Sequence, residues 1–185
     1  TAKPFPELRK RIIDALPINQ VIQKEKLNFL LNYDEGDIDN AFLILQKIDL
    51  SQLSHIECVP MLKVAEKKKA WDIAIVLLEK LLGWEKNNEA ILQIKLKLFI
   101  ANFNLERFPE VIHIGEDILE NHNEMKFLDD HNKEILLAQT VGACLKRYEY
   151  PNAEKIIKKN VSLLQRFELK ISIEAGTYLK NNDPQ

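Results

Sequence analysis

The sequence predicts an all-α fold built from helical hairpins, and three observations lead to that prediction. Apolar residues make up 46% of the 185 residues and charged residues 29%, which is the balance of a globular domain. Only 5 glycines and 7 prolines are present, few for a protein with many tight β-turns. Apolar residues recur at helical spacing along most of the chain, and strand-like alternation never exceeds four residues. We therefore expect residues 1–185 to form a single all-α domain.

Capping residues and prolines divide this helical pattern into segments. Pro17 ends the first segment, because the residue before a proline disfavours the helical conformation. Ser54 followed by Glu57 is a capping box that opens a helix. Pro60 lies too deep in that helix for its first turn, so we expect a kink or a later start there. The predicted helices span 7–16, 19–33, 37–47, 54–69, 71–82, 87–103, 109–120, 130–146, 151–164 and 167–179.

Four of the breaks between these helices share a local pattern: a short break, a bulky apolar residue, two variable residues and a small residue. The bulky residue can fill the base of a hairpin, and the small residue lets its two helices cross closely. Trp71 and Ala74 are the best-defined pair, and we expect both to be buried. The four segments read Gly36-Asp37-Ile38-Asp39-Asn40-Ala41, Lys69-Ala70-Trp71-Asp72-Ile73-Ala74, Glu106-Arg107-Phe108-Pro109-Glu110-Val111 and Tyr148-Glu149-Tyr150-Pro151-Asn152-Ala153.

This pattern resembles the Gly-x-Tyr-x-x-Ala turn of the tetratricopeptide repeat (TPR), in a degenerate form. The small residues are separated by 33, 37 and 42 positions, against 34 in a TPR. The family's Leu-Gly pair appears once, as Val141-Gly142. The resemblance implies a right-handed α-solenoid of about four helix-turn-helix hairpins with an extra helix at each end. The implied repeats cover approximately 20–50, 54–83, 88–121 and 131–165, with terminal helices at 7–16 and 167–179.

The resemblance also implies a function, which is to bind another protein. In a TPR stack the first helix of each pair lines a concave groove, where partners lie. Lysines interleaved with aromatic residues would suit a protein or peptide that is acidic and carries apolar anchors. The TPR site for chaperone tails is mostly missing, because Leu30 and Pro60 replace its asparagines. The groove residues implied are Lys26, Tyr33, Lys63, Lys67, Lys97, Phe103 and Lys146.

Two alternatives to a TPR scaffold stay open. One is another two-helix solenoid or an irregular helical bundle. The other is a helical regulatory or effector domain of a larger signalling or transcription protein. The sequence around the domain would separate these functions, because a regulator would carry a DNA-binding or membrane segment next to it.

Charge and cysteine usage bear on partners and location. The formal net charge is −2, so no overall positive field attracts nucleic acid or an anionic membrane. No apolar run reaches the ~18 to 20 residues that span a bilayer. Cys58 and Cys144 stand singly in apolar stretches, which favours buried, reduced thiols and a cytoplasmic (intracellular) protein. Nucleic acid remains a minor alternative because of two lysine clusters, Lys67–Lys69 and Lys155 with Lys158 and Lys159.

The sequence offers no catalytic motif, so we expect no enzyme, no cofactor and no metal. His113 and Asp117 are four residues apart, a spacing that metal ligands also use, but no further ligand accompanies them. We expect them to form a solvated pair on a helix surface. No glycine-rich phosphate loop or nucleophile elbow is present.

Overall fold

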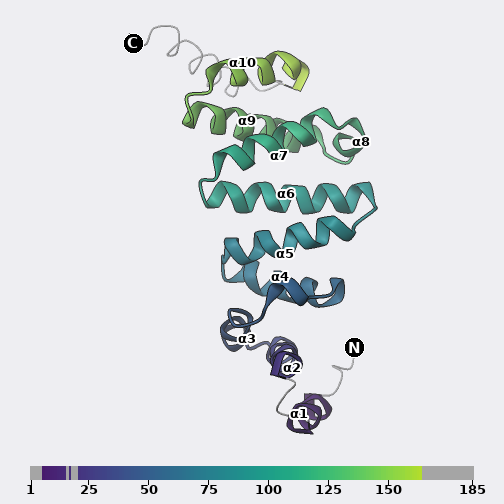
Figure 1. Cartoon of the computed structure of the whole chain (residues 1–185). Helices are drawn as coiled ribbons and strands as arrows, with labels where there is room; N and C mark the ends of the chain where they lie inside the picture. The colour runs from purple at the N-terminus through teal and green to yellow at the C-terminus, as the bar shows by residue number, and fades with distance from the viewer. Residues whose placement is uncertain (1–5, 16, 18–20, 164–185) are drawn as a thin grey trace. The chain divides into compact units, whose positions relative to one another are not determined.

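A computed structural model describes residues 6–15, 17 and 21–163 of the chain. Within these residues the secondary structure is helical and no strand is formed, which confirms the all-α class (Figure 1). Contacts group the chain into two compact units, Thr1–Trp84 and Glu85–Gln185. The boundary falls between the second and third predicted repeats. The single domain predicted from sequence stays a prediction.

The first unit consists of paired helices around an apolar core. Helix α2 packs against α1 and α3, and α4 packs against α5. Phe29 of α2 and Leu77 of α5 are fully buried in this core. The elements are α1 (Pro6–Ala15), α2 (Val21–Glu35), α3 (Ile38–Leu45), a 3₁₀ turn (Leu50–Gln52), α4 (His55–Lys67) and α5 (Trp71–Trp84).

The second unit has its own core, to which five helices contribute. Helix α7 packs against both α6 and α9, and α10 packs against α9. Leu92, Phe99, Ile118 and Leu137 are among its most buried side chains. The elements are α6 (Asn88–Asn104), α7 (Phe108–Glu120), α8 (His122–Met125), α9 (Asp130–Lys146), α10 (Tyr150–Lys159) and a 3₁₀ turn (Val161–Leu163).

The four turns with the shared sequence pattern also share one backbone geometry. Their first residue has a positive φ in every case: 84° at Gly36, 54° at Lys69, 55° at Glu106 and 60° at Tyr148. In each turn the next residue donates its N–H to a carbonyl five residues earlier, at 2.9 Å. The first residue donates to the carbonyl three residues earlier, at 3.0–3.1 Å. Together these bonds form the Schellman motif that closes a helix C-terminus.

The small and bulky positions of these turns are buried to different extents. The small residues Ala41, Ala74, Val111 and Ala153 are all buried, which confirms the burial predicted for Ala74. Trp71, however, is only half-buried, and the other three bulky residues behave in the same way. Trp71 is therefore less buried than predicted. The bulky residue is the first residue of the second helix in each pair, and its side chain is partly exposed there.

A lysine-to-glycine substitution in one of these turns should stabilise the first unit. Lys69 is exposed and has a φ of 54°, a region that costs a residue with a Cβ about 1 kcal/mol relative to glycine. Lys69→Gly should therefore raise the free energy of unfolding by up to about 1 kcal/mol, measured by urea denaturation. Lys63→Gly, in the interior of α4, should instead lower it by a similar amount. A loss of stability in both variants would contradict the prediction.

Several helix boundaries differ in detail from the sequence-based ones. The capping box is confirmed, since the Ser54 N–H donates to Glu57 Oε2 at 2.7 Å. Pro60 lies inside α4, which begins at His55 as that cap dictates. Helix α5 runs to Trp84, two residues beyond the predicted end at residue 82. The long connection after α7 contains α8. The predicted helix 167–179 lies outside the described residues.

Both cysteines are buried free thiols, in agreement with the sequence-based prediction. Burial is the main reason that the pKa of Cys144 is raised to about 11. Burial also raises the pKa of Cys58 above its ordinary value. A thiol with a raised pKa holds little thiolate near neutral pH and reacts slowly. The two side chains thus behave as small apolar residues in the cores of their units.

Candidate functional site

The first helix of three of the pairs carries an exposed stripe that mixes apolar and polar side chains. On α4, Ile56 is 83% exposed and Lys63 and Lys67 follow it at helical spacing. On α6 the exposed stripe is Gln93, Lys97, Ile100 and Phe103, and on α9 it includes Ile135, Gln139 and Lys146. Each stripe thus includes an isoleucine, Ile56, Ile100 or Ile135, that is exposed in the part of the chain that the structure describes.

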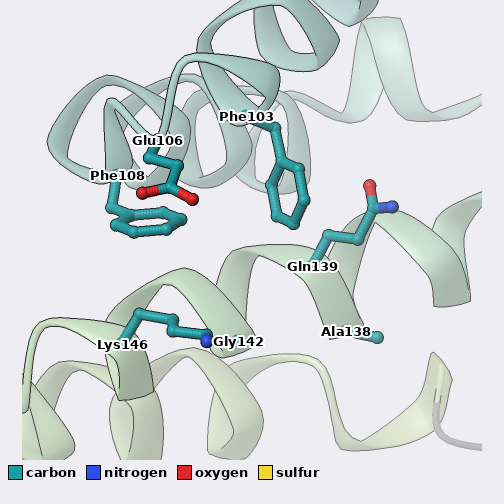
Figure 2. Close-up of a pocket in the computed structure, with 7 residues that line it drawn as sticks. All are labelled: Phe103, Glu106, Phe108, Ala138, Gln139, Gly142 and Lys146. Atoms are coloured by element: carbon teal, nitrogen blue, oxygen red, sulfur yellow. The ribbon is translucent and has the colours of Figure 1, made fainter.

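In the second unit, two of these stripes border a single pocket of about 510 Å³, here called the α6/α9 pocket (Figure 2). The end of α6 and the turn after it form one wall, and α9 forms the other. Two of the sequence-predicted groove residues, Phe103 and Lys146, lie in this pocket. Its lining is Phe103, Glu106, Phe108, Ala138, Gln139, Gly142 and Lys146.

The walls of the α6/α9 pocket are mainly apolar. The rings of Phe103 and Phe108 meet edge to face, with centroids 6.3 Å apart and planes at 80°. Phe103 is 39% exposed, so part of its ring faces the open pocket. A Cβ placed on Gly142 would meet no atom within 4 Å, and the floor beside Gly142 is therefore open space. The pocket can take an apolar group against two aromatic rings.

Three polar side chains border this apolar space, and none has a partner among the described residues. They are Glu106, Gln139 and Lys146; Figure 2 shows the Glu106 carboxylate beside the Phe108 ring and the Lys146 ammonium near Gly142. The adjacent Arg147, in contrast, is paired with Glu149 at 2.5 Å. One carboxylate, one ammonium and one amide are thus available to a ligand.

Glu106 is held in place by the backbone of its turn. Its N–H donates to Phe103 O at 3.1 Å, and the N–H of Arg107 donates to Asn102 O at 2.9 Å. These two bonds fix the positive φ of Glu106 and with it the direction of the Cα–Cβ bond. A rigid turn therefore presents the carboxylate at the pocket edge.

Lys26, one of the predicted groove residues, is buried and paired within the first unit. The residue is only 8% exposed, and its ammonium contacts Glu57 at 3.1 Å and the Gln52 carbonyl at 3.1 Å. Partial burial acts to raise the pKa of Glu57, but hydrogen bonds from Ser54 and Lys26 outweigh it and lower that pKa. Lys26 thus joins α2 to the start of α4 and is not accessible to a partner.

The other predicted groove residues of the first unit, and Lys97 of the second, differ in their exposure and contacts. Lys63 and Lys67 are exposed and form no ion pair with any described residue. Tyr33 is half-buried and stacks on Phe29, with ring centroids 6.1 Å apart. Lys97, in the second unit, is exposed and already takes part in an interaction within the chain. Lys63 and Lys67 are therefore accessible to a partner.

The described residues include no group of three or more side chains suited to hold a metal ion. His113 is exposed, and Asp117, four residues later, binds Lys95 at 2.6 Å. No helix among the described residues has both the length and the apolar character needed to cross a bilayer.

Sequence reasoning did not assign Glu106 and Phe108 to the site. In the shared turn pattern Glu106 is the first residue of the break and Phe108 is the bulky residue. Glu106 and Phe108 reach the pocket because they follow closely after Phe103, which lies near the end of α6. The pocket itself depends on α9 lying beside that turn, which no local pattern encodes.

No protein-family model matches the sequence, and no curated protein or solved structure matches it significantly.

Proposed function

We propose that this chain is a TPR-like α-solenoid module that binds another protein through the exposed faces of its first helices. The observations that carry the proposal are the separate exposed stripes of α4, α6 and α9, each of which combines an exposed isoleucine with at least one exposed lysine. Interaction surfaces combine apolar anchors with charges that orient the partner. The preferred partner is a protein or peptide with acidic residues and apolar anchors.

The repeated turn geometry supports the TPR-like part of this proposal. Four turns with one sequence pattern have the same φ sign and the same two backbone hydrogen bonds. Each has its small residue buried where two consecutive helices meet. A recurring structural unit of this kind is typical of repeat proteins, whose stacked units present extended binding surfaces.

A double charge reversal tests the binding face. Lys63→Glu with Lys67→Glu replaces two unpaired lysines on α4 by carboxylates and should repel an acidic partner. We expect affinity capture with the intact chain, read by quantitative mass spectrometry, to recover specific proteins with the wild type and to lose them with this variant. Recovery should also fall as salt is raised, because exposed charges are screened.

The matched control reverses two lysines of α10 outside these faces, Lys155 and Lys158. They pair with Glu116 at 3.6 Å and Glu154 at 2.7 Å on the surface, and such pairs contribute about 0 to 1 kcal/mol, so the fold should persist. This control should capture the same proteins as the wild type. If both variants capture them equally well while folded, the proposed face is not the binding face.

A further inference from the structure

The α6/α9 pocket combines an apolar body with both signs of charge. We propose that it binds a small zwitterionic molecule with an apolar side chain, the class to which the free apolar α-amino acids belong. This inference goes beyond the proposed protein-binding function and does not depend on it. It rests on the three unpartnered polar side chains of the pocket and on the open space beside Gly142.

The apolar part of the ligand is indicated by the walls. The rings of Phe103 and Phe108 form a right-angled corner, and the missing side chain of Gly142 leaves the opposite side open. The volume of about 510 Å³ lies within the range of about 300 to 1,000 Å³ that small-molecule pockets usually have. A phenyl or branched aliphatic side chain can therefore be covered on several sides.

The charged part of the ligand is indicated by Lys146 and Glu106. Several exposed lysines of this unit have acidic partners, as Lys159 has Glu120 at 2.5 Å and Lys158 has Glu154 at 2.7 Å. Lys146 and Glu106 line the same pocket, yet they pair neither with each other nor with any other described residue. A ligand that carries a carboxylate and an ammonium would satisfy both, and the Gln139 amide can bond either group.

A free amino acid fits this arrangement better than the interior of a peptide chain does. In a free amino acid both charges are present on one small molecule, whereas in a peptide the same groups are consumed as neutral amides. Charge-assisted hydrogen bonds are about twice as strong as neutral ones, so the amide form should bind much more weakly. The pocket should thus distinguish the free molecule from its blocked derivative.

Titration of the full chain with L-phenylalanine, followed by amide chemical shifts in NMR, tests the proposal. We expect saturable shifts of the Phe103, Gln139 and Gly142 amides. N-acetyl-phenylalaninamide should bind at least about tenfold more weakly, because it lacks both charges. Gly142→Leu should abolish the saturable shifts, since its side chain enters the pocket without meeting protein atoms near its Cβ.

Two charge variants and two half-ligands assign the groups individually. Lys146→Met should weaken phenylalanine and 3-phenylpropionate about tenfold and leave phenylalaninamide unchanged. Glu106→Gln should weaken phenylalanine and phenylalaninamide about tenfold and leave 3-phenylpropionate unchanged. Lys155→Met, outside the pocket, should change none of these affinities.

Three results would overturn the proposal. They are the absence of saturable shifts up to the solubility limit of phenylalanine, equal binding of the blocked derivative, and unchanged binding by folded Gly142→Leu. The assay contains no partner protein, and its variants differ from those that test the protein-binding face. Failure of one proposal is therefore distinguishable from failure of the other.

Discussion

Replacing Lys95 by methionine should lower the free energy of unfolding by about 3 to 5 kcal/mol. Lys95 lies on α6 with its side chain largely buried, and its Nζ contacts Asp117 Oδ2 and Glu124 Oε1, each at 2.6 Å. Glu124 is only 4% exposed, and its Oε2 already lacks a hydrogen-bond partner. Methionine keeps the apolar stem but leaves the buried carboxylate with Asn121, at 2.7 Å, as its remaining side-chain partner. A buried charge without its counter-ion is strongly destabilising.

The pH of the measurement follows from the protonation of Lys95. Partial burial, the largest single influence, lowers its pKa, but Asp117 and Glu124 together outweigh burial and the pKa lies above its ordinary value of 10.5. A cation with a raised folded-state pKa stabilises the fold fully below the unfolded-state value and loses that contribution as pH rises through the folded value. Urea denaturation at pH 7 should therefore show the full effect.

A lysine whose acidic partner is exposed and a double variant serve as controls. Lys133→Met removes an ion pair with Asp130, whose side chain is 73% exposed, and should cost at most about 1 kcal/mol. Lys95→Met combined with Glu124→Met removes both buried charges and should recover part of the loss, since an apolar pair can replace a buried ion pair. Equal destabilisation by Lys95→Met and Lys133→Met would mean that Glu124 is not effectively buried.

Much of the secondary structure could be predicted because its determinants are local. Helical spacing, the capping box at Ser54 and the four turn patterns involve residues within a few positions of each other, and the structure places helices and turns there. The positive φ of Lys69, Glu106 and Tyr148 was harder to predict from the sequence. Only Gly36 carries the residue that signals this conformation, and the Schellman hydrogen bonds impose it at the other three turns.

The candidate site was harder to predict because it depends on contacts between distant residues. Lys26 matched a groove position by spacing, yet its partner Glu57 is 31 residues away and removes it from the surface. The α6/α9 pocket likewise joins Phe103 to residues of α9 that lie more than 30 positions later. Gly142 was noticed in the sequence as part of a family pair. Its structural consequence, open space beside two phenylalanine rings, required the packed helices.

Adding one methyl group at Gly115 should destabilise the protein by about 1 to 3 kcal/mol, although alanine favours helix more than glycine does. Gly115 is a buried residue of α7, at the contact with α9. A Cβ on Gly115 would overlap the side chain of Thr140, whose Cγ2 would lie 2.7 Å away. Thr140 is fully buried, and its hydroxyl donates to Leu136 O at 2.7 Å, so the side chain cannot move aside without losing that bond.

Gly142→Ala is the matched control, because it makes the same substitution in a helix where the new Cβ meets no atom within 4 Å. It should raise the free energy of unfolding by up to about 1 kcal/mol through helix propensity alone. The difference in urea midpoint between the two variants therefore isolates the cost of overpacking between α7 and α9.

Thr140→Ala should relieve most of that cost when combined with Gly115→Ala, since it removes the Oγ1 and Cγ2 atoms that the added methyl would meet. Similar stabilisation by Gly115→Ala and Gly142→Ala would show that α7 and α9 do not approach each other closely at this point.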